Sequence, residues 1–245
     1  MTANGTAATA AGDPTLAAGP SPTGRRPVDA PATIGAWGNK GRGFAHPVDV
    51  AADPSSGTLC VLNRSTSWAS PHGGAVRVTV VDPGRHEVLG EISRRGTGPG
   101  ELMMPVGVAV DGRGRVLVTD EHTHTVSAFD LDGAFRARWG EEGGGPGQLR
   151  RPAGIAVDGD DVWVVDAGNS RLQRFGDDGR FRGHAGGPGC GPGQLHQPWF
   201  VAVGPDGDLF LRPAGIAVTP AGWLHVADWG RDRLMVFDPD LRLEA

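Results

Sequence analysis

The stretch Gly145–Arg182, GPGQLRRPAGIAVDGDDVWVVDAGNSRLQRFGDDGRFR, decides the fold. Its apolar residues fall into short runs rich in β-branched and aromatic side chains, separated by glycine, aspartate and asparagine, which is typical of short strands joined by tight turns. Asp158-Gly159 and Asp178-Gly179 supply residues that tolerate positive φ where a hairpin must reverse. No segment shows a helical apolar period. The stretch therefore predicts a four-stranded antiparallel unit.

The same unit recurs along the chain, marked by a proline before its first strand. These prolines are Pro47, Pro105, Pro152, Pro198 and Pro213. The first strands read VDVAAD, VGVAVD, AGIAVD, WFVAVG and AGIAVT, and the turn before the proline repeats as GPGEL (98–102), GPGQL (145–149) and GPGQL (191–195). A period of roughly 46 residues with four strands in each unit predicts an all-β protein, a β-propeller.

These motifs resemble the NHL-repeat family of six-bladed β-propellers. The resemblance rests on the order proline, G-I-A-V-D, V-x-D, N-x-R and apolar-x-F-D-x-x-G, and it covers about residues 35–245. It implies a closed propeller, and it implies that family members mostly bind partners, with a few enzymes among the relatives. This chain resembles a bacterial-type member that lacks about a blade and a half.

The repeat pattern predicts two regions, a disordered Ala/Pro/Gly-rich tail over residues 1–30 and a propeller over residues 31–245. Residues 32–38 match the end of a fourth strand and are expected to close the propeller by completing the last blade. The blades are expected at about 47–93, 105–140, 152–184, 198–211 (partial) and 213–245. The predicted fold class is therefore an NHL-type propeller of four whole blades plus a half blade, incomplete or open.

The fourth blade breaks the repeat. A new first strand begins at Pro213, only 15 residues after Pro198, so about 31 residues of the period are missing. An internal deletion with truncation explains this, and so does a real, shortened propeller. In either case an unclosed propeller would expose strand edges and apolar faces.

Composition and charge exclude several classes of function. The net charge is −5 and Lys40 is the only lysine, so we expect no nucleic-acid partner, unlike the animal members of the family that bind RNA through a positive face. No apolar stretch approaches the ~20 residues of a membrane span, and residues 1–30 lack the apolar core of a secretory signal. Cys60 and Cys190 lie in different blades, so no disulfide is expected. These observations predict a soluble, cytoplasmic protein without a membrane partner.

The most regular polar pattern lies at the ends of the second strands, at Asn63, Asp120, Asp166 and Asp228. An arginine follows five residues later at Arg171 and Arg233, and Thr125 holds that place in the second blade. One interpretation is a ring of charged groups around one face of the propeller. The other is structural, with each aspartate accepting backbone N–H bonds in the turn and pairing with arginine. Repetition in every blade favours the structural interpretation.

His122 and His124 form the densest histidine cluster, and on a strand both could reach one metal ion. Amidating lyases of the same superfamily bind zinc through three histidines, and residues 120–126 resemble one lyase segment in which His122 is the matching ligand. The positions of the other ligands lack histidine here: they are Val48, Val106, Ala153, Trp199 and Ala214. The chain also has no tyrosine to match the catalytic tyrosine of those lyases.

A calcium-dependent lactonase of the gluconolactonase type would need Glu, Asn and Asp side chains from selected blades, whereas the second-strand residues recur regularly. No nucleophile motif such as G-x-S-x-G is present. We therefore expect no catalytic residue and no cofactor. Zinc or calcium is the weaker alternative, and His122 and His124 are the weaker candidates for a metal ligand.

Two tryptophans lie outside the core positions of the repeat. Trp68 belongs to an insertion in the first blade, residues 64–74, and Trp229 follows a second strand. Turns of that kind lie together on one face of the disc, where we predict a recognition surface. Its candidate residues are Trp68, His122, His124, Arg171, Trp229 and Arg231. The sequence thus favours a non-enzymatic scaffold that binds a protein or peptide, with a metal-dependent hydrolase or lyase as the alternative.

Overall fold

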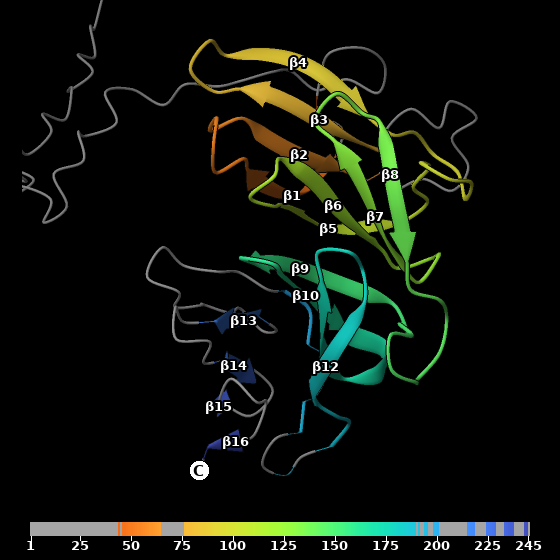
Figure 1. The fold of residues 1–245 in the computed structure, drawn as a ribbon, viewed down its shortest axis with the longest axis vertical. Helices are drawn as coiled ribbons and strands as arrows, with labels where there is room; N and C mark the ends of the chain where they lie inside the picture. Colours follow the sequence, from red (N-terminus) through yellow and green to blue (C-terminus); the bar gives the residue numbers. More distant parts are fainter. Residues whose placement is uncertain are drawn as a thin grey trace, which may run out of the picture. The chain divides into compact units, whose positions relative to one another are not determined.

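The computed structural model describes residue 44, residues 46–64, 76–189, 191, 194–195 and 198–200, and the backbone of four short strands between 215 and 244. Figure 1 shows that these residues form strands joined by turns. The described residues also include the 3₁₀ turn η1 (Ala167–Asn169). The strands make four-stranded antiparallel sheets in which spatial order follows chain order. The predicted all-β class and the four-stranded blades are therefore confirmed.

Each sheet is one repeat of the sequence. Sheet I contains β1 (Pro47–Ala52), β2 (Leu59–Asn63), β3 (Arg77–Asp82) and β4 (Glu87–Ile92). Sheet II contains β5 (Pro105–Val110), β6 (Arg115–Asp120), β7 (Thr125–Asp130) and β8 (Phe135–Trp139). Sheet III contains β9 (Pro152–Asp158), β10 (Asp161–Asp166), β11 (Arg171–Gly176) and β12 (Phe181–Gly186). Sheet IV contains β13 (Gly215–Val218), β14 (Leu224–Asp228), β15 (Arg233–Phe237) and β16 (Leu243–Glu244).

The turns divide between two ends of each sheet. In an antiparallel meander, the turn between the second and third strands lies at the same end as the start of the first strand. We call this the 2–3 end, and we call the opposite end the 1–2 end. At the 1–2 end of sheet III, Gly159 (φ +56°) and Gly179 (φ +80°) adopt the left-handed conformation that the Asp-Gly dipeptides predicted.

Apolar cores fill the spaces between neighbouring sheets. One core joins sheets I and II, and a second joins sheets II and III. Each sheet uses matching repeat positions to pack on the sheet before it: Val108, Val118 and Phe129 in sheet II, and Ile155, Val164 and Phe175 in sheet III. The sequence repeat is therefore also a repeat of packing.

The first strands of neighbouring sheets approach very closely. A Cβ atom added to Gly107 in β5 would lie 2.7 Å from the Ala153 carbonyl oxygen and 3.2 Å from the Gly154 Cα atom in β9. The Gly154 N–H in turn donates to the Trp199 carbonyl at 2.8 Å. In β1 an aspartate replaces the glycine, and the Asp49 carboxylate accepts the Val108 N–H at 2.8 Å. The first strands β1, β5 and β9 are thus joined by close contacts. The backbone of β9 leaves no room for a side chain at Gly107 in β5.

Several predicted features lie outside the described residues. They are the tail over 1–30, the closing strand over 32–38, residues 65–74 of the first-blade insertion, and residues 201–211 of the partial fourth blade. Because residues 32–38 are outside the described residues, their closing role stays a prediction; in the structure the fourth strand of sheet IV is β16, which pairs with β15. Within the described residues, no helix has the length and apolar character needed to cross a membrane.

Cys60 in β2 is fully buried and is not part of a disulfide. Burial, with a smaller contribution from Asp53, raises the pKa of its thiol to about 12. Because the thiolate is the reactive form, we expect Cys60 in the folded Cys190→Ser variant to react with a disulfide reagent at pH 8 roughly 1000-fold more slowly than in the unfolded chain. Stopped-flow absorbance with and without denaturant measures this ratio. A fast reaction of the folded protein would contradict the burial of this strand.

Candidate binding site

Asp120, the last residue of β6, organises the 2–3 end of sheet II. Its carboxylate accepts the N–H groups of Met103 and Met104, which lead into β5, with the shortest distance 2.6 Å to Met103. It also accepts the N–H groups of His122 and Thr123 in the following turn, at 3.0 and 3.1 Å. One carboxylate therefore fixes two segments of the 2–3 end against each other.

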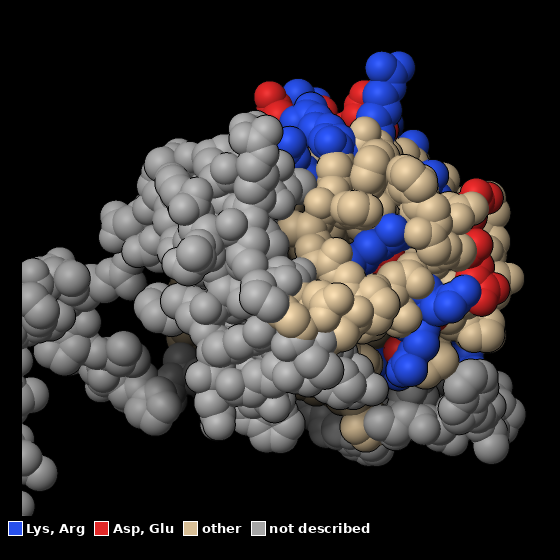
Figure 2. All heavy atoms as spheres, turned by 90° about the horizontal axis from the view of Figure 1, so that it is seen from below, with Lys and Arg blue, Asp and Glu red and all other residues tan. Residues whose placement is uncertain are grey.

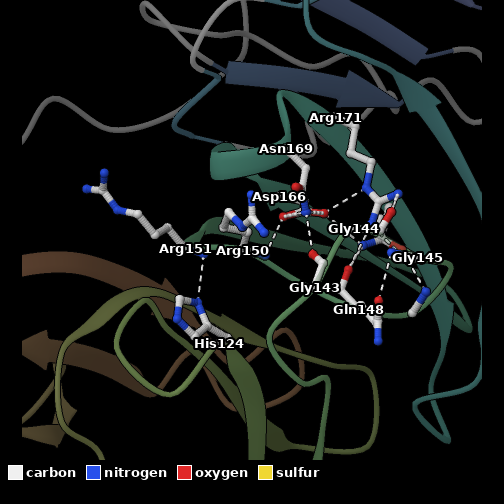
Figure 3. Close-up of polar contacts among 12 residues, drawn as sticks. His124, Gly143, Gly144, Gly145, Gln148, Arg150, Arg151, Asp166, Asn169 and Arg171 are labelled. Atoms are coloured by element: carbon white, nitrogen blue, oxygen red, sulfur yellow. Dashed lines mark hydrogen bonds and ion pairs between the residues drawn. The ribbon is translucent and has the colours of Figure 1, made fainter.

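Asp166 has the same role in sheet III (Figure 3). Its buried carboxylate accepts the Arg150 N–H and the Arg171 Nε–H, both at 2.7 Å. The Arg171 guanidinium continues to the carbonyl oxygens of the glycine turn, at Gly144, Gly145 and Gln148. These bonds agree with the structural interpretation of the recurring Asp and Arg residues.

Sheet II holds its glycine turn through a different arginine. Thr125 occupies the place that Arg171 has in sheet III, and Arg138 in β8 donates instead to the carbonyl oxygens of Thr97, Gly98 and Glu101. These are the counterparts of the three carbonyls that Arg171 contacts. The sequence pattern missed Arg138 because the residue lies on the fourth strand, where no other blade repeats it.

The 2–3 end of sheet II forms one wall of an open hollow of about 290 Å³. Its lining residues are Met104, Glu121, His122, His124 and Arg151. Met104 precedes β5, the acid and the two histidines belong to the β6–β7 turn, and Arg151 precedes β9. Residues from two neighbouring blades therefore meet in this hollow.

Glu121 lies between two arginines at this junction. Its side chain is 8% exposed and forms ion pairs with Arg64 at 2.5 Å and Arg151 at 3.3 Å. Arg64 follows β2, so the two pairs connect sheet I, the β6–β7 turn and the start of sheet III. The carboxylate balances only one of the two positive charges that contact it.

His124 fixes the backbone of Arg151. The Arg151 N–H donates to His124 Nδ1 at 3.0 Å, which Figure 3 shows between two neighbouring segments. Both residues have positive φ, +59° for His124 and +49° for Arg151. Since Nδ1 accepts a bond, the proton of the neutral ring lies on Nε2, which is left as a donor.

The structure brings together only part of the predicted recognition surface. His122 and His124 line the hollow, whereas Trp68, Trp229 and Arg231 lie outside the described residues. Arg171 is 7% exposed and holds the glycine turn, so little of its side chain is available to a partner. Glu121 and Arg151 were not predicted, although the first adjoins the histidine cluster and the second precedes a repeat proline.

A metal site was the alternative expectation for the histidines. Among the described residues, no group of three or more His, Cys, Asp or Glu side chains is arranged to hold a metal ion. His124 Nδ1 is occupied by the Arg151 N–H. The metal-dependent hydrolase or lyase stays a prediction from sequence.

Charged side chains of both signs lie side by side on the described part of the face drawn in Figure 2, rather than as one basic field. The positive excess of Arg64 and Arg151 over Glu121 belongs to three side chains. A local excess favours recognition of one charged group over non-specific attraction of a polyanion.

Comparisons with known proteins find similarity within the repeats of this chain. The NHL repeat family model matches residues 102–129 and 149–175. Protein lin-41 of Caenorhabditis elegans is 50% identical to this chain over 42 residues, which are 17% of this chain and 4% of that protein.

Solved structures with low sequence identity share the fold. A chain of hydrazine synthase from Kuenenia stuttgartiensis is 16% identical with a TM-score of 0.52, and the match covers 82% of this chain and 49% of that one. A chain from a complex of nidogen with laminin is 15% identical with a TM-score of 0.51, covering 81% of this chain and 78% of that one. The chain thus spans about half of the hydrazine synthase chain and a small part of lin-41. At this level of identity the likeness is one of fold.

Proposed function

We propose that this chain, an NHL-type β-propeller, is a non-enzymatic scaffold that binds a protein partner at the 2–3 end of its blades. The hollow lined by the β6–β7 turn and Arg151 is the observation that carries the proposal. It combines an exposed histidine, an exposed arginine and a half-buried methionine, His122, Arg151 and Met104. Arginine and methionine are enriched at protein interfaces.

Two further points support a protein as the partner. Loops positioned by a rigid scaffold are where binding residues concentrate, and Asp120 and Asp166 make the 2–3 end rigid through the bonds described above. One of the similar structures is a complex of nidogen with laminin, so a propeller of this fold occurs in an assembly of two proteins.

Replacing one exposed histidine by glutamate tests which end of the blades binds the partner. We expect His122→Glu to reduce partner capture by about fivefold or more, as the loss of an interface residue does, while His86→Glu leaves capture unchanged. His86 is an exposed histidine in the β3–β4 turn at the 1–2 end, so it is a matched control. The measurement is quantitative mass spectrometry of proteins retained by the immobilised full chain, wild type and variants, each with its melting temperature verified. Equal capture by both variants would place the partner elsewhere.

A further inference from the structure

The hollow at the 2–3 end adjoins a cluster of three charged side chains, of which Glu121 and Arg151 line it and Arg64 pairs with Glu121. One carboxylate, Glu121, contacts two guanidinium groups, those of Arg64 and Arg151. Glu121, Arg64 and Arg151 together carry one excess positive charge. The Glu121 side chain is 8% exposed and is paired with both arginines, so its negative charge is offset by the two guanidinium groups.

Arg151 is the cation that a ligand can reach. Its side chain is 60% exposed, compared with 25% for Arg64. It contacts Glu121 through the terminal nitrogen Nη2, and a guanidinium has five N–H donors in a planar fork that matches a carboxylate. The fork therefore has donors for a second carboxylate while the first pair stays in place.

Arg151 is also held in position before any ligand arrives. Its backbone N–H is bound to His124 Nδ1 at 3.0 Å, and Asp166 fixes the preceding residue through the Arg150 N–H. A preorganised site loses less conformational entropy when it binds. The fixed backbone places the start of the Arg151 side chain at the hollow that it lines.

The size of the hollow restricts what it can hold. Its volume of about 290 Å³ lies at the lower limit for small-molecule pockets, and it is open to solvent rather than enclosed. Met104 adds one apolar contact to the charged wall. These dimensions suit one or two side chains of an extended segment.

We propose that this hollow binds an acidic side chain, Asp or Glu, from an exposed segment of the partner protein, with Arg151 as the charged contact and Met104 as the apolar one. The location of this contact rests on the proposed function, whereas the acidic character of the partner segment goes beyond it. An electrostatic contact of this kind weakens as ionic strength rises.

The test uses peptides of defined charge and the full chain. The probes are acetyl-GEDEG-amide and its neutral counterpart acetyl-GQNQG-amide, titrated by calorimetry and by NMR of arginine side chains. We expect the acidic peptide to bind about tenfold more tightly than the neutral one, and Arg151→Glu to abolish that difference. Arg85→Glu is the matched control, because Arg85 is 76% exposed and lies in the β3–β4 turn at the 1–2 end. It should leave the affinity within about twofold.

Three outcomes would overturn the inference. They are equal affinity for the two peptides, an Arg151→Glu variant that still prefers the acidic peptide, and tighter binding of a single-stranded oligonucleotide than of the acidic peptide at the same ionic strength. If the peptides fail while partner capture still depends on His122, only the acidic class of the partner is wrong. If capture is also independent of His122, the proposed function is wrong as well.

Discussion

A Gly107→Val variant is expected to lose about 3 kcal/mol or more of unfolding free energy, because overpacking a tight interior site costs typically 1–3 kcal/mol even where side chains can yield. Here the obstacles are backbone atoms, with the Ala153 oxygen 2.7 Å and the Gly154 Cα atom 3.2 Å from the position of the new Cβ. Neither can move without separating β5 from β9. The buried Thr119 hydroxyl, 3.1 Å away, blocks the same space.

Urea denaturation followed by tryptophan fluorescence measures this loss. Gly90→Ala is the control, since Gly90 is also in a strand, β4, and has no atom within 4 Å of the added Cβ. Alanine there should change stability by less than about 1 kcal/mol. A Gly107→Val protein as stable as wild type would show that the inner strands do not approach as closely as described.

Replacing Asp166 by alanine is expected to cost about 3–5 kcal/mol, the range observed when one partner of a buried ion pair is removed. The carboxylate is fully buried and accepts bonds from Arg150, Asn169, Arg171 and Gln173. Its loss leaves the Arg171 guanidinium, 7% exposed, without a countercharge. The glycine turn that Arg171 holds should loosen at the same time.

A double variant separates the charge penalty from the loss of packing. Asp166→Ala with Arg171→Met removes both charges and is expected to be more stable than Asp166→Ala alone. Asp160→Ala is the surface control, because Asp160 is 76% exposed and its pair with Arg113 is 3.7 Å long; it should change stability by less than about 0.5 kcal/mol. Thermal and urea denaturation give both comparisons. A harmless Asp166→Ala substitution would leave the recurring aspartates without a structural role.

The sequence predicted the features that recur in every blade, namely the strands, the turns and the structural role of the recurring aspartates. Alternating apolar residues and Asp-Gly turns located the strands, because both depend on neighbours within one blade. The recurrence of Asp120 and Asp166 indicated a structural role, and the structure shows these carboxylates fixing the chain that enters each blade. Positions shared by every copy were therefore interpretable from sequence.

The candidate site was only partly predictable, because its contacts join different copies. The ion pairs of Glu121 reach Arg64 in one direction and Arg151 in the other, separated from it by 57 and 30 residues. No local pattern encodes such pairs. His122 and His124 departed from the repeat and were therefore noticed, whereas Arg151 did not stand out because it adjoins the recurring proline motif.

The two ways of holding the glycine turn have a consequence for how such chains diverge. Arg171 on the third strand and Arg138 on the fourth reach equivalent carbonyls, so one blade can exchange the third-strand arginine for a fourth-strand arginine and keep its turn supported. A column-by-column comparison of repeats would record such an exchange as a loss, although the supported conformation is unchanged.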